Sequence, residues 1–320
     1  PPVLAHGTLV GRPRLPDGTK PAPVAPDQLP KTATIGLVNV YNSRRPFPDG
    51  TRIAALRVWQ ILPKVKPIVG EPRLGACDQT PGRQYLGRVP VEEDGSAFFE
   101  APSGVPILFH AVNEHGVAVQ GMRSVTYVAP GETLMCNGCH EQRTGAAVAG
   151  GPRTAASPLA MRRAPSRLVE GPDGSNPYSY PRLVQPVLDA KCVSCHGETR
   201  KAAMPDLRRG DPDKDRFSFY TSFYSLVPYV HYFTHAYRGD WSKVGVQRDA
   251  FVMPYTEPGK FGAMASPLYA LLETRHHDVV LTEEERLRLL LFMDSNAAYF
   301  GHDHDIAAQA RGERVLPILQ

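Results

Sequence analysis

Apolar and turn-forming residues alternate along the first part of the chain in a pattern typical of β-structure. Between residues 33 and 128, short runs rich in Val, Ile, Leu and Phe are separated by clusters such as Pro-Asp-Gly and Glu-Asp-Gly. This spacing predicts a small antiparallel sandwich or barrel. We expect its strands at residues 33–40, 52–62, 84–91, 97–100, 105–112, 117–120 and 123–128.

A helical period appears later in the chain. Apolar residues recur every three or four positions at residues 183–190, 267–275 and 281–300. The last segment opens with Thr282-Glu-Glu-Glu285, a capping box that satisfies free N–H groups of a first helical turn. Its predicted buried stripe comprises Leu287, Leu290, Leu291, Ser295 and Tyr299. The whole pattern predicts an α+β, multidomain chain in which an antiparallel β-rich domain precedes a mainly helical one.

Two further segments show neither the strand pattern nor the helical period. Residues 1–30 contain eight prolines, and residues 145–178 consist largely of Gly, Ala, Ser, Pro and Arg. The chain holds 28 glycines and 32 prolines among 320 residues, which is above the usual share of roughly 12%. We therefore predict a Pro-rich extended arm at 1–30, a β-rich domain at 31–144, a linker at 145–178 and a helical domain at 179–320.

Charge and apolar run lengths exclude two classes of protein. Lys plus Arg is 36 and Asp plus Glu is 32, and no run of like charge reaches five residues, so the chain is not a dedicated nucleic-acid binder. No apolar run approaches the roughly 20 residues of a membrane helix, so we expect no transmembrane segment. The chain begins Pro-Pro-Val-Leu without Met, and we expect an exported protein that has lost any signal sequence.

Four of the five cysteines carry the strongest chemical signal. They form two pairs, each followed at once by histidine: Cys136-Asn-Gly-Cys139-His140 and Cys192-Val-Ser-Cys195-His196. This is the attachment pattern of c-type haem, in which two thiols bind the porphyrin and the histidine binds its iron. The sequence therefore predicts two covalently bound haem c groups, with His140 and His196 as the proximal iron ligands.

A Cys₄ zinc site and disulfides are the alternatives. Zinc ribbons separate their pairs by about 15–20 residues, whereas 52 residues lie between Cys139 and Cys192. Zinc would also leave the repeated histidine without a role. Because haem c is attached outside the cytoplasm, we expect a periplasmic or other exocytoplasmic location. The fifth cysteine, Cys77, is most simply a thiol, with a metal or intermolecular role as the alternative.

Several longer motifs resemble the hydrazine synthase alpha subunit and related multihaem cytochromes over roughly residues 33–301. The matching stretches are Leu37-Val-Asn-Val-Tyr41, Ala54-Ala-Leu-Arg-Val58, Val89-Pro-Val-Glu-Glu-Asp-Gly-Ser-Ala-Phe98, Val119-Gln-Gly-Met-Arg-Ser124, Pro130-Gly-Glu-Thr133, Tyr180-Pro-Arg-Leu-Val-Gln-Pro-Val-Leu188, His276-His-Asp-Val279, Leu281-Thr-Glu-Glu284 and Asp294-Ser-Asn-Ala-Ala-Tyr-Phe-Gly301. The resemblance implies a β-rich domain that carries haem 1 and a helical domain that carries haem 2, in the middle and C-terminal part of such a subunit.

One position departs from that family. The family's reactive first haem takes its axial ligand from a tyrosine four residues after the motif histidine, and that histidine binds zinc. Here the corresponding residue is Thr144, a poor ligand for iron. We therefore expect His140 to bind iron in the usual way, without hydrazine chemistry.

The second axial ligand decides whether each haem exchanges electrons or binds small molecules. For haem 2 we predict His276, which stands between two predicted helices and matches the family's distal position; Met204 and Met253, each followed by Pro, are alternatives. For haem 1 the candidates are His110, His115 and His231, and the sequence does not choose among them. The run Gly-His302-Asp-His304-Asp indicates a solvated turn.

Two functions of different classes remain. The first is electron transfer between redox partners, such as other cytochromes, by a dihaem subunit of a larger multi-subunit complex. It is favoured because no nucleophile elbow, P-loop or dinucleotide fingerprint occurs. The alternative is a haem-dependent oxidoreductase that acts on a small nitrogen or oxygen species at a five-coordinate haem 1. It is supported by the family resemblance and by the lack of an obvious distal ligand.

Overall fold

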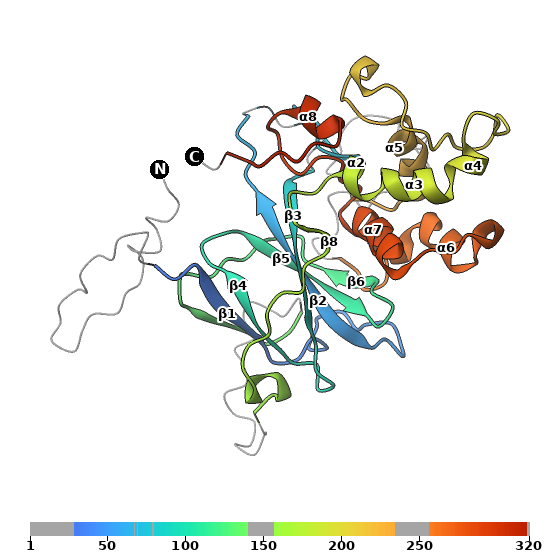
Figure 1. The fold of residues 1–320 in the computed structure, drawn as a ribbon. Helices are drawn as coiled ribbons and strands as arrows, with labels where there is room; N and C mark the ends of the chain where they lie inside the picture. The colour runs from blue at the N-terminus through green and yellow to red at the C-terminus, as the bar shows by residue number, and fades with distance from the viewer. Residues whose placement is uncertain are drawn as a thin grey trace.

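Strands and helices occupy opposite sides of the molecule. The computed structural model describes residues 29–139 apart from 67, 69 and 79, and then residues 157–233 and 256–318. Figure 1 shows the strands of the first part below and the helices of the second part gathered to one side of them. This arrangement confirms the predicted α+β class with its β-rich first half and helical second half.

Two β-sheets pack face to face in the first half. One has the strand order β4-β1-β7, formed by β4 (Ala97–Pro102), β1 (Thr32–Leu37) and β7 (Thr133–Cys136). The other has the order β3-β2-β5-β6, formed by β3 (Gly82–Pro90), β2 (Ile53–Leu62), β5 (Ile107–Asn113) and β6 (Ala118–Gly121). All pairs are antiparallel except β1 with β7.

A shared apolar interior makes the two sheets a sandwich. Ile35 and Phe99 of one sheet and Val58 and Ile107 of the other are all buried in one cluster, here called the sandwich core. The ring of Phe99 meets Phe109 edge to face with centroids 5.8 Å apart. Alternating apolar side chains on the inner faces give a core of this kind, so the predicted sandwich is confirmed.

The strand predictions were wrong at two places near the first cysteine pair. Residues 123–128 form no strand; Thr126 makes a single bridge to Ile107. Val125 and Tyr127, which suggested the strand, are instead exposed. The strand in this region is β7, which the sequence analysis missed because its apolar pattern is short. It pairs in parallel with β1 and ends at Cys136.

The helical half contains α2 (Tyr180–Leu183), α3 (Gln185–Lys191), α4 (Val193–His196), α5 (Thr221–Leu226), α6 (Pro267–Glu273), α7 (Glu283–Asp294) and α8 (Ile306–Ala310). Short 3₁₀ turns connect them: η3 (Pro212–Lys214), η4 (Val227–Tyr229), η6 (Gly262–Ala265) and η7 (His276–Asp278). Buried aromatic rings fill the space between α2, α5 and α7. Tyr180 stacks on Tyr299 with centroids 5.0 Å apart and meets Phe223 and Phe292 edge to face.

Proline, and residues whose backbone has a left-handed conformation, determine where the predicted helices begin and end. The segment 183–190 is divided at Val184, because Pro186 near the start of α3 has no N–H to donate. The capping box of α7 is confirmed, with Glu285 donating to the Thr282 hydroxyl and receiving the Thr282 N–H. Helix α7 ends at Asp294, six residues before the predicted end, and Asn296 and Ala297 follow with φ of 64° and 50°.

One hydrophobic cluster joins the two halves. It contains Trp59, Leu108 and Val117 from the strands together with Tyr180 and Leu290 from the helices, and we call it the junction core. Within this junction the guanidinium of Arg57 on β2 pairs with Asp294 at the end of α7, both fully buried. The helices are therefore packed against the outer face of the four-stranded sheet, as Figure 1 shows.

The described part of the predicted linker lies along the sandwich. It includes η2 (Leu159–Arg162) and β8 (Pro172–Ser175). Isolated bridges join Ser166 to Phe99, Val169 to Arg88 and Pro177 to Gln84. Residues 157–178 therefore cover part of the sheet surface, as a wrapped linker would, whereas residues 145–156 lie outside the described residues.

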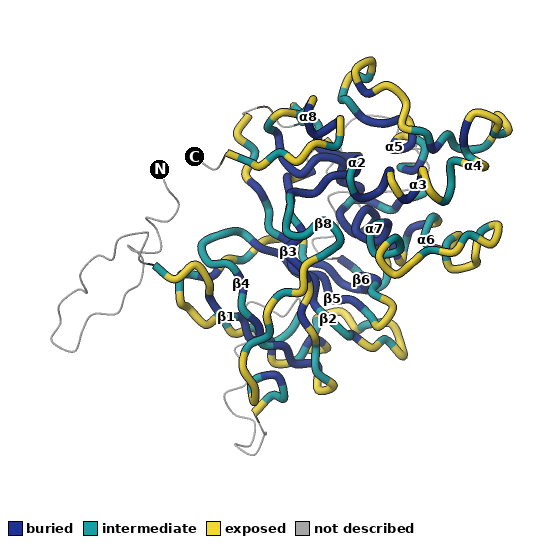
Figure 2. Tube along the Cα trace, in the orientation of Figure 1, coloured by how far each residue is buried: buried dark blue, intermediate teal, exposed yellow. Residues whose placement is uncertain are grey.

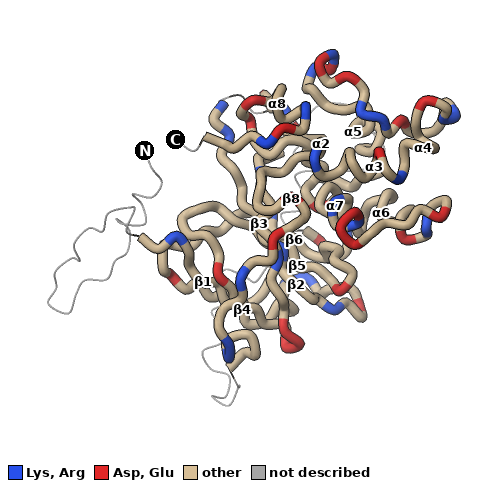
Figure 3. The backbone as a smooth tube through the Cα atoms, viewed as in Figure 1, with Lys and Arg blue, Asp and Glu red and all other residues tan. Residues whose placement is uncertain are grey.

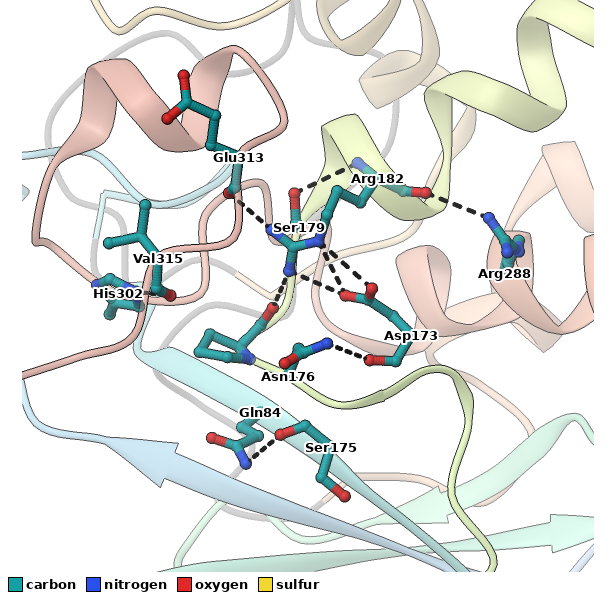
Figure 4. A network of polar contacts seen from close by, with 11 residues as sticks. Gln84, Asp173, Ser175, Asn176, Ser179, Arg182, Arg288, His302, Glu313 and Val315 are labelled. Atoms are coloured by element: carbon teal, nitrogen blue, oxygen red, sulfur yellow. Dashed lines mark hydrogen bonds and ion pairs between the residues drawn. The ribbon is translucent and has the colours of Figure 1, made fainter.

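A polar network holds the start of the helical half in place (Figure 4). Arg182 on α2 donates to the Asp173 carboxylate at 2.9 and 3.1 Å, to the Pro177 carbonyl and to the Glu313 carbonyl. Arg288 of α7 donates in turn to the Arg182 carbonyl at 3.2 Å. The Arg182 side chain thus ties α2 to the linker and to the C-terminal segment, and its backbone carbonyl ties α2 to α7.

No helix in the described ranges is long and apolar enough to cross a membrane.

Candidate haem sites

The second cysteine pair lies on one short helical stretch. Cys192 lies between the end of α3 and the start of α4, and His196 ends α4 one turn later, with its N–H donating to the Cys192 carbonyl at 2.9 Å. Residues four apart lie on one face of a helix, so Cys192 and His196 face the same side. Gly197 follows where a Cβ atom would come within 2.5 Å of the Val193 carbonyl oxygen. A glycine is needed there to leave the helix directly after the histidine.

A backbone carbonyl fixes the orientation of the His196 ring. Its Nδ1 lies 3.1 Å from the carbonyl oxygen of Pro205. A carbonyl only accepts, so Nδ1 carries the proton and Nε2 keeps its lone pair. The loop that supplies this carbonyl is itself held, because the Leu207 N–H donates to the His196 carbonyl at 3.0 Å. This arrangement is the usual way in which a protein prepares an imidazole as a metal ligand.

His276 faces His196 across the site. The two ring centroids are 6.1 Å apart and the ring planes are inclined by 36°. His276 lies in η7 between Arg275 and His277, whose φ angles of 51° and 48° are in the left-handed region. Such a backbone is strained for non-glycine residues and turns the chain sharply after α6. Burial lowers the pKa of His276, as do His277 and His196, which favours the neutral ring that a metal requires.

The spacing of the two rings fits one metal ion between them. An imidazole nitrogen lies about 2 Å from a bound metal, so two rings on opposite sides of one ion have centroids roughly 6 Å apart. The observed 6.1 Å meets this requirement. Two histidines, with thiols for covalent attachment beside one of them, are the protein's share of a six-coordinate haem c.

The surroundings also leave apolar surface for a porphyrin. Helix α6 contains Leu268, Tyr269, Leu271 and Leu272 in seven residues, and none of them is fully buried, although all except Leu271 pack in part against the junction core. Leu271 is 38% exposed. A helix of this composition normally buries an apolar face. Figure 2 shows α6 and α4 as an outer edge with much exposed and half-buried surface. A flat apolar group that lies between these helices would cover it.

The Cys192 thiol is the better shielded of the second pair. Burial raises its pKa to about 11, with further contributions from Cys195 and Glu285. At neutral pH the metal-free side chain is therefore a thiol. Among the described residues no group of three or more His, Cys, Asp or Glu side chains could hold a metal ion. The two cysteine pairs also pack against different cores, so each pair forms a site of its own.

The first cysteine pair lies at the edge of the sandwich. Cys136 ends β7, and both Cys136 and Cys139 pack against the sandwich core. Gly138 between them approaches Asn42 so closely that a Cβ atom would lie 1.8 Å from the Asn42 carbonyl oxygen. His140, the predicted proximal ligand, lies outside the described residues, as does Thr144. Its role as an iron ligand stays a prediction.

The three candidates for the distal side of haem 1 lie in different places. His110 on β5 is buried on the other face of its sheet from the sandwich core, against Trp59 and Phe261. His115 is exposed in the turn between β5 and β6, 3.9 Å from Glu114. His231 packs edge to face on Phe233, beside η6. Of the alternatives for haem 2, Met204 is half-buried in the loop after His196, and Met253 lies outside the described residues.

Two features of the second site were missed in the sequence analysis. The Pro205 carbonyl is a backbone atom nine positions from His196, and no residue pattern marks it. The apolar residues of α6 did provide a signal, but they were used only to predict a helix at 267–275. The prediction of a solvated turn at 302–304 was wrong, because His302 is fully buried. Its Nε2 contacts the Val315 carbonyl at 2.9 Å, and its Nδ1 accepts the His304 N–H.

Comparison with known proteins gives one family-model match. Residues 69–141, a stretch that includes the first cysteine pair, match the family model for the hydrazine synthase alpha subunit middle domain. This finding confirms the resemblance drawn from the sequence motifs. No curated protein matches the chain.

A solved structure extends the likeness to most of the chain. The chain is similar to Kuenenia stuttgartiensis hydrazine synthase, with a TM-score of 0.59 over 90% of this chain and 19% sequence identity. At this identity the likeness shows a common fold. The chain spans 46% of that protein's length, so it corresponds to about half of its relative.

Proposed function

We propose that this chain is a dihaem c-type cytochrome that transfers electrons between redox partners as a subunit of a larger complex. The opposed rings of His196 and His276 carry this proposal. Two neutral imidazoles on one iron leave no position for a substrate, and haems ligated in this way serve electron transfer. Similarity to a named multi-subunit enzyme supports the assembly, and haem c attachment supports a periplasmic or other exocytoplasmic site.

Each residue of the second site has a distinct task. Cys192 and Cys195 would attach the porphyrin, while His196 and His276 would bind iron from its two faces. The bound haem supplies a one-electron couple between ferric and ferrous iron. The Pro205 carbonyl holds the His196 ring through Nδ1, so that its Nε2 would be free to bind iron, and the turn at η7 holds the His276 ring beside it. Because both ligands are set by backbone geometry, little reorganisation is expected when the charge of the iron changes.

Replacement of His276 tests this function directly. In His276→Ala, one haem is expected to change from low spin to high spin in electron paramagnetic resonance and visible spectra of the oxidised protein. Its reduction potential is expected to rise, because a strong donor to ferric iron is lost. His277→Asn is the matched control, since Asn tolerates the left-handed backbone. An unchanged spectrum in His276→Ala would remove His276 as the ligand and with it the main support for electron transfer.

The alternative function concerns haem 1 and needs a separate measurement. An oxidoreductase that acts on a small nitrogen or oxygen species needs an open iron position, and the resemblance to hydrazine synthase supports it. Nitrite, hydroxylamine, cyanide and carbon monoxide should leave the spectra of the wild-type protein unchanged if both haems are six-coordinate. If a single haem of the wild-type protein binds one of these ligands, and still binds it in His276→Ala, the oxidoreductase function is favoured.

A further inference from the structure

A surface cavity of about 480 Å³ lies where three distant parts of the chain meet. It is bordered by the loop that follows β2, by residues 216–218 before α5, and by Ile306 at the start of α8. Its volume falls within the range of about 300–1,000 Å³ that small-molecule sites occupy. None of the cysteines of the two pairs lines it, nor does His196 or His276, so the cavity is separate from both candidate haem sites.

One part of the cavity wall is apolar. Phe217 and Ile306 pack in part against the junction core, which gives this wall a firm base. Ile68 completes the wall from the loop and is 57% exposed. The guanidinium carbons of Arg73 and Arg216 lie 5.2 and 5.1 Å from the Phe217 ring centroid. Because two cations already lie over that ring, the apolar surface left for a ligand is mainly aliphatic.

The loop that follows β2 is held in place by polar contacts of its own. The Asp303 carboxylate is fully buried and accepts the N–H groups of Val65 and Lys66 at 2.9 and 3.1 Å. The Lys64 ammonium donates to the Ile68 carbonyl at 3.1 Å. Because these contacts fix the loop, the cavity exists before any ligand binds, and less entropy is lost when one does.

Two of the four charged side chains that line the cavity already have a partner of opposite charge. Arg73 forms an ion pair with Asp78 at 3.2 Å. Burial lowers the pKa of Lys64, while Asp303 and Glu71 act in the opposite direction, so Glu71 already faces a cation.

The other two charged side chains are cations without such a partner. Lys66 and Arg216 both line the cavity, and among the described residues neither forms an ion pair. Solvated cations are common on protein surfaces, but these two share one cavity with an aliphatic wall. Ligand sites typically combine an apolar wall with a few charged groups that orient the ligand. The combination therefore suits an anion that carries an apolar body.

We propose that this cavity binds a small carboxylate with an aliphatic body. The carboxylate would contact Lys66 and Arg216, and the aliphatic chain would cover Ile68 and Ile306. An inorganic anion would leave the aliphatic wall exposed to water, and a neutral chain would leave both cations without a partner. This ligand class follows from the cavity alone and does not depend on the electron-transfer function.

Sodium octanoate is the probe for this site. Isothermal titration of the wild-type holoprotein at constant ionic strength is expected to show saturable binding of octanoate. Acetate, which lacks the chain, and octanamide, which lacks the charge, should each bind at least about fivefold more weakly. A higher sodium chloride concentration should weaken octanoate binding, because salt screens exposed charges. Equal affinity for octanoate and octanamide would overturn the proposal.

Three variants locate the binding site. Arg216→Gln and Lys66→Gln each remove one exposed charge and should each weaken octanoate binding by roughly fivefold, the upper range for an exposed ion pair. Lys214→Gln removes an exposed cation of η3 that does not line the cavity, so this control should keep the wild-type affinity. Haem spectra of each protein show that it is folded. A wild-type protein that does not bind octanoate saturably would contradict the proposal, as would wild-type affinity in both Arg216→Gln and Lys66→Gln.

Discussion

At the scale of single residues, the pair formed by Arg57 and Asp294 shows how the two halves are held together. Both side chains are buried, and the carboxylate also accepts backbone N–H groups of Ala263 and Ala118. Burial raises the pKa of Asp294, while Arg57 and the hydrogen bonds act in the opposite direction. The Asp294 carboxylate therefore stabilises the fold mainly through its ion pair with Arg57. Removal of either side chain leaves the charge of the other unbalanced.

Asp294→Asn is expected to lower the free energy of unfolding by about 3–5 kcal/mol, the usual cost of an unpaired buried charge. The double variant Asp294→Asn with Arg57→Met should recover much of this loss, because no buried charge remains. Arg163→Ala, which breaks the half-exposed pair with Glu92, should change stability by less than about 1 kcal/mol. Urea unfolding of the four proteins measures these values. An Asp294→Asn protein as stable as Arg163→Ala would contradict the role assigned to the pair.

Single residues also mark what the sequence could and could not reveal about the site. Two thiols and a histidine in five residues indicate haem attachment by chemistry alone, and haem attachment at both motifs stays a prediction. His276 was chosen because it lies between two helical periods, and the structure places its ring beside that of His196. The partner of His196, a carbonyl of Pro205, depends on how a loop returns to the helix. No local pattern encodes such a return.

At the scale of elements, His302 connects the end of the helical half to the C-terminal segment. Its ring donates through Nε2 to Val315 and accepts the His304 N–H through Nδ1, which requires the neutral form. Burial lowers the pKa of His302, although the Val315 carbonyl acts in the opposite direction. Between this lowered pKa and the ordinary value of 6.5, the unfolded chain binds more protons than the folded one. Stability from this group is thus present above pH 6.5 and is lost as the pH falls.

His302→Gln should reduce the dependence of stability on pH between 6.5 and 5. The wild-type protein is expected to lose up to about 1.4 kcal/mol per pH unit through this one group. The variant will be less stable at pH 7.5 but should lose less on acidification. His115→Gln, at an exposed position, should keep the wild-type slope. Urea midpoints at four pH values provide the test. Equal slopes of stability against pH in all three proteins would exclude His302 as a source of this pH dependence.

Helices and strands were predictable from the sequence where one physical rule dominates. The strands between residues 32 and 121 follow the alternation of apolar side chains, and the capping box located the start of α7. Errors arose where tertiary contacts override the local pattern. Helix α7 stops at Asp294 because Tyr299 and Phe300 donate their N–H groups to Leu74 instead. Strand β7 has only four residues, too few for a clear alternation, and its pairing with β1 decides its conformation.

At the scale of the whole molecule, the junction core makes the two halves depend on each other. Trp59 and Leu108 of the sheet are buried in the same cluster as Tyr180 and Leu290 of the helices. Acidic and basic residues are interspersed along both halves (Figure 3), so no strong field drives the halves apart. Each haem would thus be held by its own half, while the stability of each half depends on the other.

A cut in the linker between residues 148 and 149 should therefore leave the molecule in one piece. We expect a protein with a protease site inserted there to elute as a single species after cleavage, with both haems present. The two fragments should also unfold together, so that ellipticity at 222 nm and the haem absorbance change at one temperature. The same cleavage in Asp294→Asn should weaken this association, because the buried pair across the junction is lost. Fragments that separate on the column without that substitution would show two independent domains, and the shared core would then contribute little to stability.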